Sequence, residues 1–169
     1  MRVLVTAASR HGSTREIAQE IAQEIRAAGL ECDQLEPKEI SSVADYGCVI
    51  VGSAIYVGNW MAEARDLLDR TRMELLDRKV WLFSSGLSDT PSKEANSTPA
   101  LFARMKDVGA VEHRHFSGKL DVLALSLAER AAIMAARGKY GDARDMEAVR
   151  GWASQIAQSI GAQHPAQVD

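Results

Sequence analysis

The sequence predicts an α/β protein built on a parallel, doubly wound sheet with helices on both faces. Apolar, strand-like runs alternate along the chain with amphipathic helical segments, as in sheets whose strands are joined by crossover helices. The run at residues 48–53 is apolar on both faces, as a buried parallel strand requires. The first apolar run leads directly into a turn rich in glycine and hydroxyl groups and then into a helix. These three observations predict the fold class.

The first half of the chain predicts three strands and one helix. Residues 3–7 form an apolar strand, and the helix at residues 14–28 carries isoleucine every fourth residue, at 17, 21 and 25. Gly29 ends that helix. Residues 31–36 alternate in the manner of an edge strand that Pro37 closes, and residues 48–53 form the third strand.

The second half predicts two more strands and three more helices. A helix is expected over residues 60–76, with its core side marked by leucines and Ala64. Residues 79–85 form the fourth strand, and after a loop at residues 86–99 Pro99 opens a helix that reaches residue 108. The fifth strand spans residues 111–120 and is either continuous or broken near residues 117–118. The last helix spans residues 145–160, with one apolar face.

Composition and charge predict one globular domain. The chain has 169 residues, of which 46% are hydrophobic and 25% charged, so we expect a single domain over residues 1–161 and a frayed tail at residues 162–169. The net charge of -3 provides no basic footprint for nucleic acid. No secretory leader and no apolar run of membrane-spanning length is evident, so the expected location is the cytoplasm.

The stretch Ser9-Arg10-His11-Gly12-Ser13-Thr14, between the first strand and the first helix, predicts a phosphate-binding loop. A helix start presents unpaired backbone N–H groups and the positive end of the helix dipole, and both favour an anion. Three hydroxyl groups add donors, and the glycine permits close approach or a positive φ. The alternative is a plain helix cap, because serine and threonine commonly cap helices.

The same loop lacks the residues that other phosphate-binding classes require. It has no lysine at the helix entry, which excludes the loop of nucleoside triphosphatases, and no G-x-G-x-x-G, which argues against a dinucleotide site. It has no cysteine nucleophile. The ends of the first and third strands also lack the acidic residues of response-regulator receivers. The loop therefore suits a phosphate monoester that is held and not reacted.

Residues Val5 to Thr14, followed by Ile17 and Ala18, resemble the FMN phosphate loop of flavodoxin-like proteins. The segments at 51–58, 83–86, 116–120 and 141–147 extend the likeness over residues 1–160 and resemble the subfamily that includes the menaquinone-dependent protoporphyrinogen dehydrogenases. That subfamily's tryptophan in Asp-Trp-Glu is Met146 here. The resemblance implies a flavodoxin-like three-layer sandwich, a five-stranded parallel sheet in the order 2-1-3-4-5, and FMN as the cofactor.

Three loops, at residues 9–14, 53–60 and 84–90, are expected to meet beyond the carboxyl ends of the strands, where open α/β sheets bind ligands. Tyr56 is the expected contact of the flavin ring, whereas Trp60 either contacts the ring or packs in the core. The third loop offers backbone groups to the pyrimidine edge, as in the family, unless it is an ordinary strand-ending turn. The expected cofactor-binding residues are Ser9, Arg10, His11, Gly12, Ser13, Thr14, Ser53, Ala54, Ile55, Tyr56, Val57, Gly58, Ser84, Ser85, Gly86, Leu87 and Ser88.

The remaining reactive side chains predict neither a metal site nor a disulfide. No histidine spacing matches a zinc site, and the alternating His113 and His115 are expected to face solvent or a partner. Cys32 and Cys48 fall in strands that the implied sheet order separates by the first strand, too far for a disulfide. No pattern requires a catalytic acid or base, so catalytic residues stay unassigned and the chemistry is assigned to the flavin.

Residues 120–141 depart most from a minimal flavodoxin. They are rich in leucine and carry Arg130, Arg137 and Lys139, so they form either a helix packed on the domain or an apolar, basic-edged helix that rests on a membrane surface. In the quinone-linked subfamily the corresponding region is an insertion on the substrate or partner side.

Three functions remain open. The leading hypothesis is an FMN-dependent oxidoreductase that takes electrons or hydride from an organic substrate, protoporphyrinogen by resemblance, and passes them to a quinone-type acceptor. The alternatives are a flavodoxin-type electron carrier that serves a protein redox partner, and a flavodoxin-fold binding or regulatory protein with weak or lost FMN binding. The modest net charge of -3 favours an enzyme or a protein with a specialised partner over a general electron shuttle, because flavodoxins as a family tend to be strongly acidic on the face that docks partners. Peripheral contact with a membrane fits the quinone hypothesis.

Overall fold

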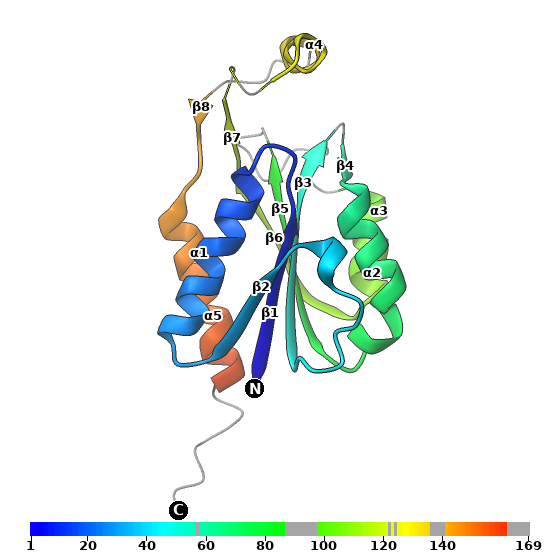
Figure 1. Cartoon of the computed structure of the whole chain (residues 1–169), viewed down its shortest axis with the longest axis vertical. Coiled ribbons are helices and arrows are strands. Elements are labelled where there is room, and N and C mark those ends of the chain that lie inside the picture. The colour runs from blue at the N-terminus through cyan, green and yellow to red at the C-terminus, as the bar shows by residue number, and fades with distance from the viewer. Residues whose placement is uncertain (57, 87–97, 122, 124, 136–140, 162–169) are drawn as a thin grey trace, which may run out of the picture.

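A parallel sheet divides the molecule into three layers (Figure 1). The computed structural model describes residues 1–56, 58–86, 98–121, 123, 125–135 and 141–161. Hydrogen-bonded neighbours follow the order β2-β1-β3-β5-β6, and all four pairs are parallel. The strands are β1 (Arg2–Ala8), β2 (Glu31–Leu35), β3 (Cys48–Tyr56), β5 (Lys79–Gly86) and β6 (Ala110–Ser117). This is the order expected from the sequence, so the predicted fold class is confirmed.

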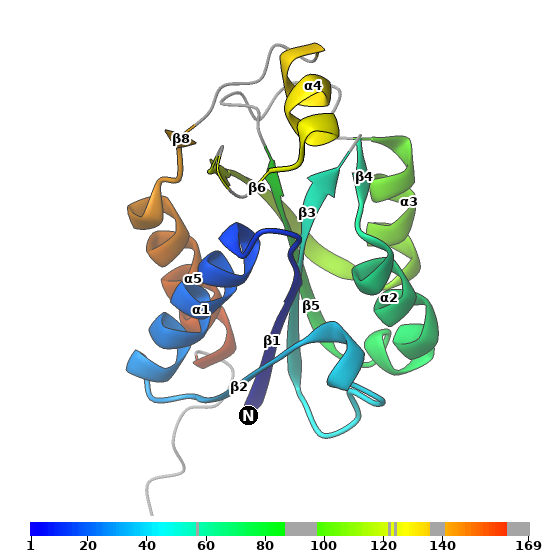
Figure 2. The ribbon, with the colours of Figure 1, turned by 45° about the horizontal axis from the view of Figure 1, so that its top comes forward.

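Helices cover both faces of the sheet (Figures 1 and 2). Helices α1 (Ser13–Ala27) and α5 (Met146–Gly161) lie on one face, and α2 (Ala62–Leu75) and α3 (Pro99–Asp107) lie on the other. A short 3-10 helix, η1 (Pro37–Glu39), follows β2. Alternate residues of a strand point to opposite faces, so Val3 and Val5 of β1 pack with α1 and α5, whereas Leu4 packs with α2. The sheet therefore separates two hydrophobic cores.

Helix α2 begins later than the sequence predicts. Trp60 belongs to a two-residue strand, β4 (Asn59–Trp60), which turns back and pairs antiparallel with the end of β3. Ile55 lies opposite Trp60, and Tyr56 lies opposite Asn59. The prediction of a helix from residue 60 was therefore wrong over its first two residues.

The expected fifth strand is broken at Gly118. β6 ends at Ser117, and β7 (Lys119–Leu120) forms a separate two-stranded sheet with β8 (Gly141–Asp142). Between them lies α4 (Leu127–Ala135), which stands beyond the carboxyl ends of the parallel strands, apart from the two helical layers (Figures 1 and 2). Residues 120–141 thus place a helix over the end of the sheet where ligands bind in this class of fold.

The two cysteines lie on opposite sides of β1. Val3 is paired with Cys32 of β2 and with Cys48 of β3, and both thiols are free. Burial raises the pKa of the Cys32 thiol to about 11. The prediction that the cysteines form no disulfide is confirmed, because a strand separates them.

Candidate functional site

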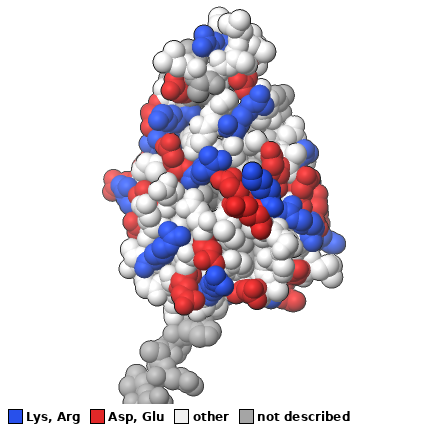
Figure 3. All heavy atoms as spheres, in the orientation of Figure 1, with Lys and Arg blue, Asp and Glu red and all other residues white. Residues whose placement is uncertain are grey.

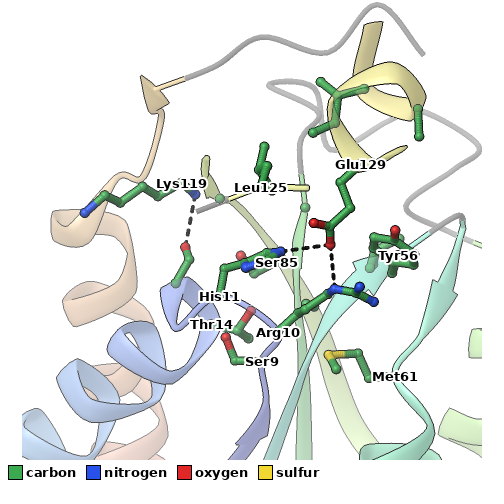
Figure 4. Close-up of a pocket in the computed structure, with 17 residues that line it drawn as sticks. Ser9, Arg10, His11, Thr14, Tyr56, Met61, Ser85, Lys119, Leu125 and Glu129 are labelled. Atoms are coloured by element: carbon green, nitrogen blue, oxygen red, sulfur yellow. Dashed lines mark hydrogen bonds and ion pairs between the residues drawn. The ribbon is translucent and has the colours of Figure 1, made fainter. Parts of the chain in front are cut away.

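A pocket of about 250 Å³ lies at the carboxyl end of the sheet, beneath α4 (Figure 4). Its walls come from the loop after β1, the end of β3, the end of β5, the β6–β7 junction and α4. The lining residues are Ser9, Arg10, His11, Ser13, Thr14, Ala54, Ile55, Tyr56, Met61, Ser85, Gly86, Gly118, Lys119, Leu125, Glu129, Ala132 and Ile133. All three predicted loops therefore contribute to one pocket.

The loop after β1 leaves the start of α1 without a side-chain cap. The N-cap residue is Gly12, in the left-handed conformation with φ of 88°, and it provides no side-chain cap to the first turn of α1. Ser13 and Thr14, which line the pocket, lie inside the first turn. Ser9 Oγ accepts a hydrogen bond of 3.0 Å from the backbone N–H of Gly12, which closes the loop. A plain serine or threonine cap does not describe this geometry.

Glu129 of α4 reaches down to the loop. Its Oε1 lies 2.6 Å from Arg10 Nε and 3.1 Å from His11 Nε2. Its Oε2 accepts a hydrogen bond of 2.8 Å from the backbone N–H of Ser126. The backbone N–H of Glu129 donates in turn to Ser126 Oγ, so the two residues form a capping box at the start of α4. The hydrogen bond from the backbone N–H of Ser126 is the main cause that lowers the pKa of Glu129 to about 2, and His11 and Arg10 lower this pKa further. The carboxylate is therefore ionised at neutral pH.

Tyr56 stands across the pocket from the same loop. The Cζ atom of Arg10 lies 4.9 Å from the centroid of the Tyr56 ring, within the range of a cation–π contact. The Tyr56 side chain is 42% exposed. The loop, the end of β3 and α4 thus meet at one cluster of side chains (Figure 4).

Two predicted site residues lie behind the pocket wall. Ser53 is fully buried, and its Oγ accepts from Met61 N–H and donates to the carbonyl of Ala54. Ser84 is also fully buried. Its Oγ accepts a hydrogen bond of 2.8 Å from Trp60 Nε1 and lies 2.7 Å from His113 Nε2. Trp60 is 6% exposed. Trp60 therefore packs, as one of its two interpretations held, and both serines support the wall from behind.

His113 is partly buried. It lies beside Trp60, with ring centroids 6.4 Å apart, and burial is the main cause that lowers its pKa to about 4. Nε2 of His113 therefore lies against Ser84 inside the protein, whereas we expected His113 to face solvent or a partner, and only part of the residue stays exposed. Within the described part of the chain, no group of three or more His, Cys, Asp or Glu side chains forms a metal site.

The structure places most of the other predicted residues at the pocket. Ala54, Ile55, Tyr56, Ser85 and Gly86 line it, whereas Gly58 lies in the adjoining hairpin turn without lining it. The predictions for Val57, Leu87 and Ser88 lie outside the described residues. Sequence reasoning missed Met61, Gly118, Lys119, Leu125, Glu129, Ala132 and Ile133. The pattern Ser126-x-x-Glu129 before an apolar run was the available signal for the start of α4.

The sequence over residues 4–146 matches the family model described as flavodoxin domain. Oxidised flavodoxin 1 from Bacillus cereus superposes with a TM-score of 0.64 at 17% identity, covering 98% of this chain and 100% of that one. Flavodoxin from Streptococcus pneumoniae TIGR4 superposes with a TM-score of 0.62 at 17% identity, covering 96% of this chain and 99% of that one. The Flv1 flavodiiron core from Synechocystis sp. PCC6803 gives 0.65 at 18% identity, with 96% of this chain and 36% of that one covered. The sequence matches no curated protein.

Proposed function

The chain belongs to the flavodoxin domain family, and we propose that it is an FMN-dependent oxidoreductase that moves electrons or hydride from an organic substrate to a quinone-type acceptor. Membership of the family implies FMN as the cofactor. The flavin supplies the redox chemistry, and the protein positions it and excludes competing reactions.

The residues at the pocket suit a flavin mononucleotide. The phosphate would be held by the loop from Ser9 to Thr14, where the first turn of α1 offers backbone N–H groups and the hydroxyls of Ser13 and Thr14. Tyr56 offers an aromatic face to the ring, and Ser85 and Gly86 offer backbone groups at the end of β5. The observation that carries the proposal is the start of α1, where Gly12 provides no side-chain cap and Ser13 and Thr14 of the first turn line the pocket.

The roof of the pocket favours an enzyme with an apolar substrate. Leu125 and Ile133, each 7% exposed, line the pocket from the segment that holds α4. A planar apolar substrate fits a pocket bounded by such side chains. Protoporphyrinogen is the substrate that the subfamily resemblance suggests, and a quinone is the acceptor that it suggests.

The outer side of the same segment is apolar too. Leu123, Leu127 and Met134 are 88%, 81% and 72% exposed. We propose that this surface rests against a membrane where a lipid-soluble quinone is held. No helix in the described part of the chain is long and apolar enough to span a membrane.

The second candidate is an electron carrier for a protein partner. On the face shown in Figure 3, basic and acidic side chains are interspersed and no broad acidic surface stands out. Interspersed charges give weak electrostatic steering, which favours the enzyme over a carrier that docks with many partners. A binding or regulatory protein with lost flavin affinity is the third candidate.

One preparation separates the three candidates. The purified protein is titrated with FMN, FAD and riboflavin, with visible absorbance and fluorescence quenching as readouts. We expect FMN to bind more tightly than FAD, because the pocket is built for a terminal phosphate. Flavin reduced on the protein is then mixed with a soluble quinone analogue: rapid reoxidation supports the enzyme, and reoxidation by a redox protein alone supports the carrier. A protein that bound no flavin would contradict both.

A further inference from the structure

The Arg10 side chain crosses the pocket and covers a surface that the flavin ring would use. Its guanidinium carbon lies 4.9 Å from the Tyr56 ring centroid, and its Nε lies 2.6 Å from Glu129 Oε1 (Figure 4). Three side chains from three parts of the chain therefore form one continuous contact. They come from the loop after β1, the end of β3 and α4.

Glu129 is the anchor of α4 in this contact. The Glu129 side chain is 6% exposed, and its carboxylate accepts from the backbone N–H of Ser126 at the start of α4 and pairs with Arg10 and His11 on the loop. The buried apolar anchors of the described part of this segment are Leu125 and Ile133, while Leu123, Leu127 and Met134 point to solvent. With so little apolar burial, the position of α4 depends strongly on the charged contact.

A bound flavin would compete with this contact in two ways. A planar ring stacked on the same face of Tyr56 takes the place of the Arg10 guanidinium. A phosphate monoester on the loop brings about 1.5–2 negative charges close to the Glu129 carboxylate, which repels it. Both effects weaken the pairing of Arg10 with Glu129, and so both loosen α4.

We propose that Tyr56, Arg10 and Glu129 form a latch that holds α4 over the pocket, and that flavin binding opens the latch and frees α4. The identity of the ligand rests on the proposed function. Opening uncovers the apolar side chains of Leu125 and Ile133, so a substrate gains access to the pocket only after the cofactor is in place. Linkage requires the reverse effect as well: weakening the latch strengthens flavin binding.

Glu129→Gln tests the latch, because it keeps the size of the side chain and removes its charge. The matched control is Glu20→Gln, which removes the carboxylate that Arg150 binds at 2.8 Å on the α1–α5 face, away from the pocket. We expect Glu129→Gln to bind FMN about 5- to 50-fold more tightly than the natural protein. Glu20→Gln should bind FMN as the natural protein does.

Amide hydrogen exchange in residues 127–135 gives a readout independent of activity. In the natural protein, exchange there should accelerate when FMN is added. In Glu129→Gln it should be fast without flavin and change little on binding. Arg10→Gln, which breaks the latch from the loop side, should show the same fast exchange, so the test does not depend on the folding of a single variant.

Two results would overturn the latch. If FMN slowed exchange in α4 of the natural protein, α4 would close on the flavin instead of being released by it. If Glu129→Gln bound FMN equally or more weakly, the coupling would be absent. If no variant bound flavin, the proposed function would fail and the flavin trigger with it, whereas fast α4 exchange in Glu129→Gln would still support the latch between α4 and the loop.

Discussion

Trp60 Nε1 donates a hydrogen bond of 2.8 Å to the Oγ of Ser84, and this buried bond joins the β3–β4 hairpin to the end of β5. His113 Nε2 lies 2.7 Å from the same oxygen, so β6 is tied to the same point. Because Ser84 accepts from the indole, its own hydroxyl proton is available to donate to His113. The hairpin that carries Tyr56 is therefore fixed from behind by a polar bridge between three strands.

We predict that the partly buried His113 causes a loss of stability in mild acid. Burial lowers its pKa to about 4, from an ordinary value of 6.5 in the unfolded chain. Between these two pH values the unfolded state binds more protons, so the free energy of unfolding falls as the pH falls, by up to about 1.4 kcal/mol per pH unit. Urea unfolding between pH 7 and pH 4 measures the slope. His113→Gln keeps an acceptor for Ser84 without titrating, so equal slopes in both proteins would count against this assignment.

We predict that replacing Gly12 by Ala separates the effect on flavin binding from the effect on folding. A Cβ atom at Gly12 meets no atom within 4 Å, so Gly12→Ala costs only the left-handed backbone at φ 88°, on the order of 1–2 kcal/mol. Gly29, at the other end of α1, has φ of 83° and equally open surroundings. Gly29→Ala should lower the melting temperature as much as Gly12→Ala. FMN titration should show weaker binding for Gly12→Ala alone, and equal affinities would argue that the loop is not the phosphate site.

Much of this arrangement follows from local sequence patterns. Apolar periodicity located α1, α2 and α5 within a few residues, because their stripes at Ile17, Leu67 and Trp152 are fully or almost fully buried against the sheet. The turn between β1 and α1 could be located because the strand, the glycine and hydroxyl residues and the helix follow one another directly along the chain, and Ser9 Oγ accepts from Gly12 N–H within it. Such patterns report a residue's own surroundings along the chain.

The features that sequence patterns did not predict depend on contacts between residues far apart in the chain. The place of Trp60 is set by Ser84, 24 residues away, and the same apolar residue suits a helix start equally well. Glu129 lies 118 residues from His11, so no local pattern could bring it to the loop. His113 was expected to face solvent or a partner, but its hydrogen bond with Ser84, 29 residues away, offsets part of the cost of burying its ring.

We predict that removing the Thr14 hydroxyl lowers the affinity for FMN and leaves the affinity for riboflavin, which has no phosphate, unchanged. It is 2% exposed at the start of α1 and lines the pocket. Thr14→Ala would remove one hydroxyl bond to a charged acceptor, worth about 1.5–3 kcal/mol, or roughly 10- to 100-fold in FMN affinity. Riboflavin, which has no phosphate, is the control ligand and should bind both proteins alike. A parallel loss of both ligands would indicate local unfolding instead, and Thr14→Ser should restore FMN binding.

Leu123 and Leu127 predict which side of the α4 segment meets the electron acceptor. They are 88% and 81% exposed, so replacing both by Ser removes no core contact and should leave the melting temperature and the FMN affinity unchanged. If their surface meets a membrane-held quinone or a docking partner, turnover with a quinone presented in lipid vesicles should fall, while turnover with a water-soluble quinone analogue should not.

Leu125 provides the matched control for that pair, because it is 7% exposed and lines the pocket from the same segment. Leu125→Ala should lower the free energy of unfolding by about 2–5 kcal/mol if its surroundings do not collapse, and it should reduce turnover with the soluble quinone analogue as well as with quinone in vesicles. A Leu123→Ser, Leu127→Ser protein that kept its flavin and still reduced quinone in vesicles at the original rate would contradict a role for the exposed surface. The apolar exterior of α4 would then offer no argument for a membrane-held acceptor, and the electron carrier would become the better account of this protein.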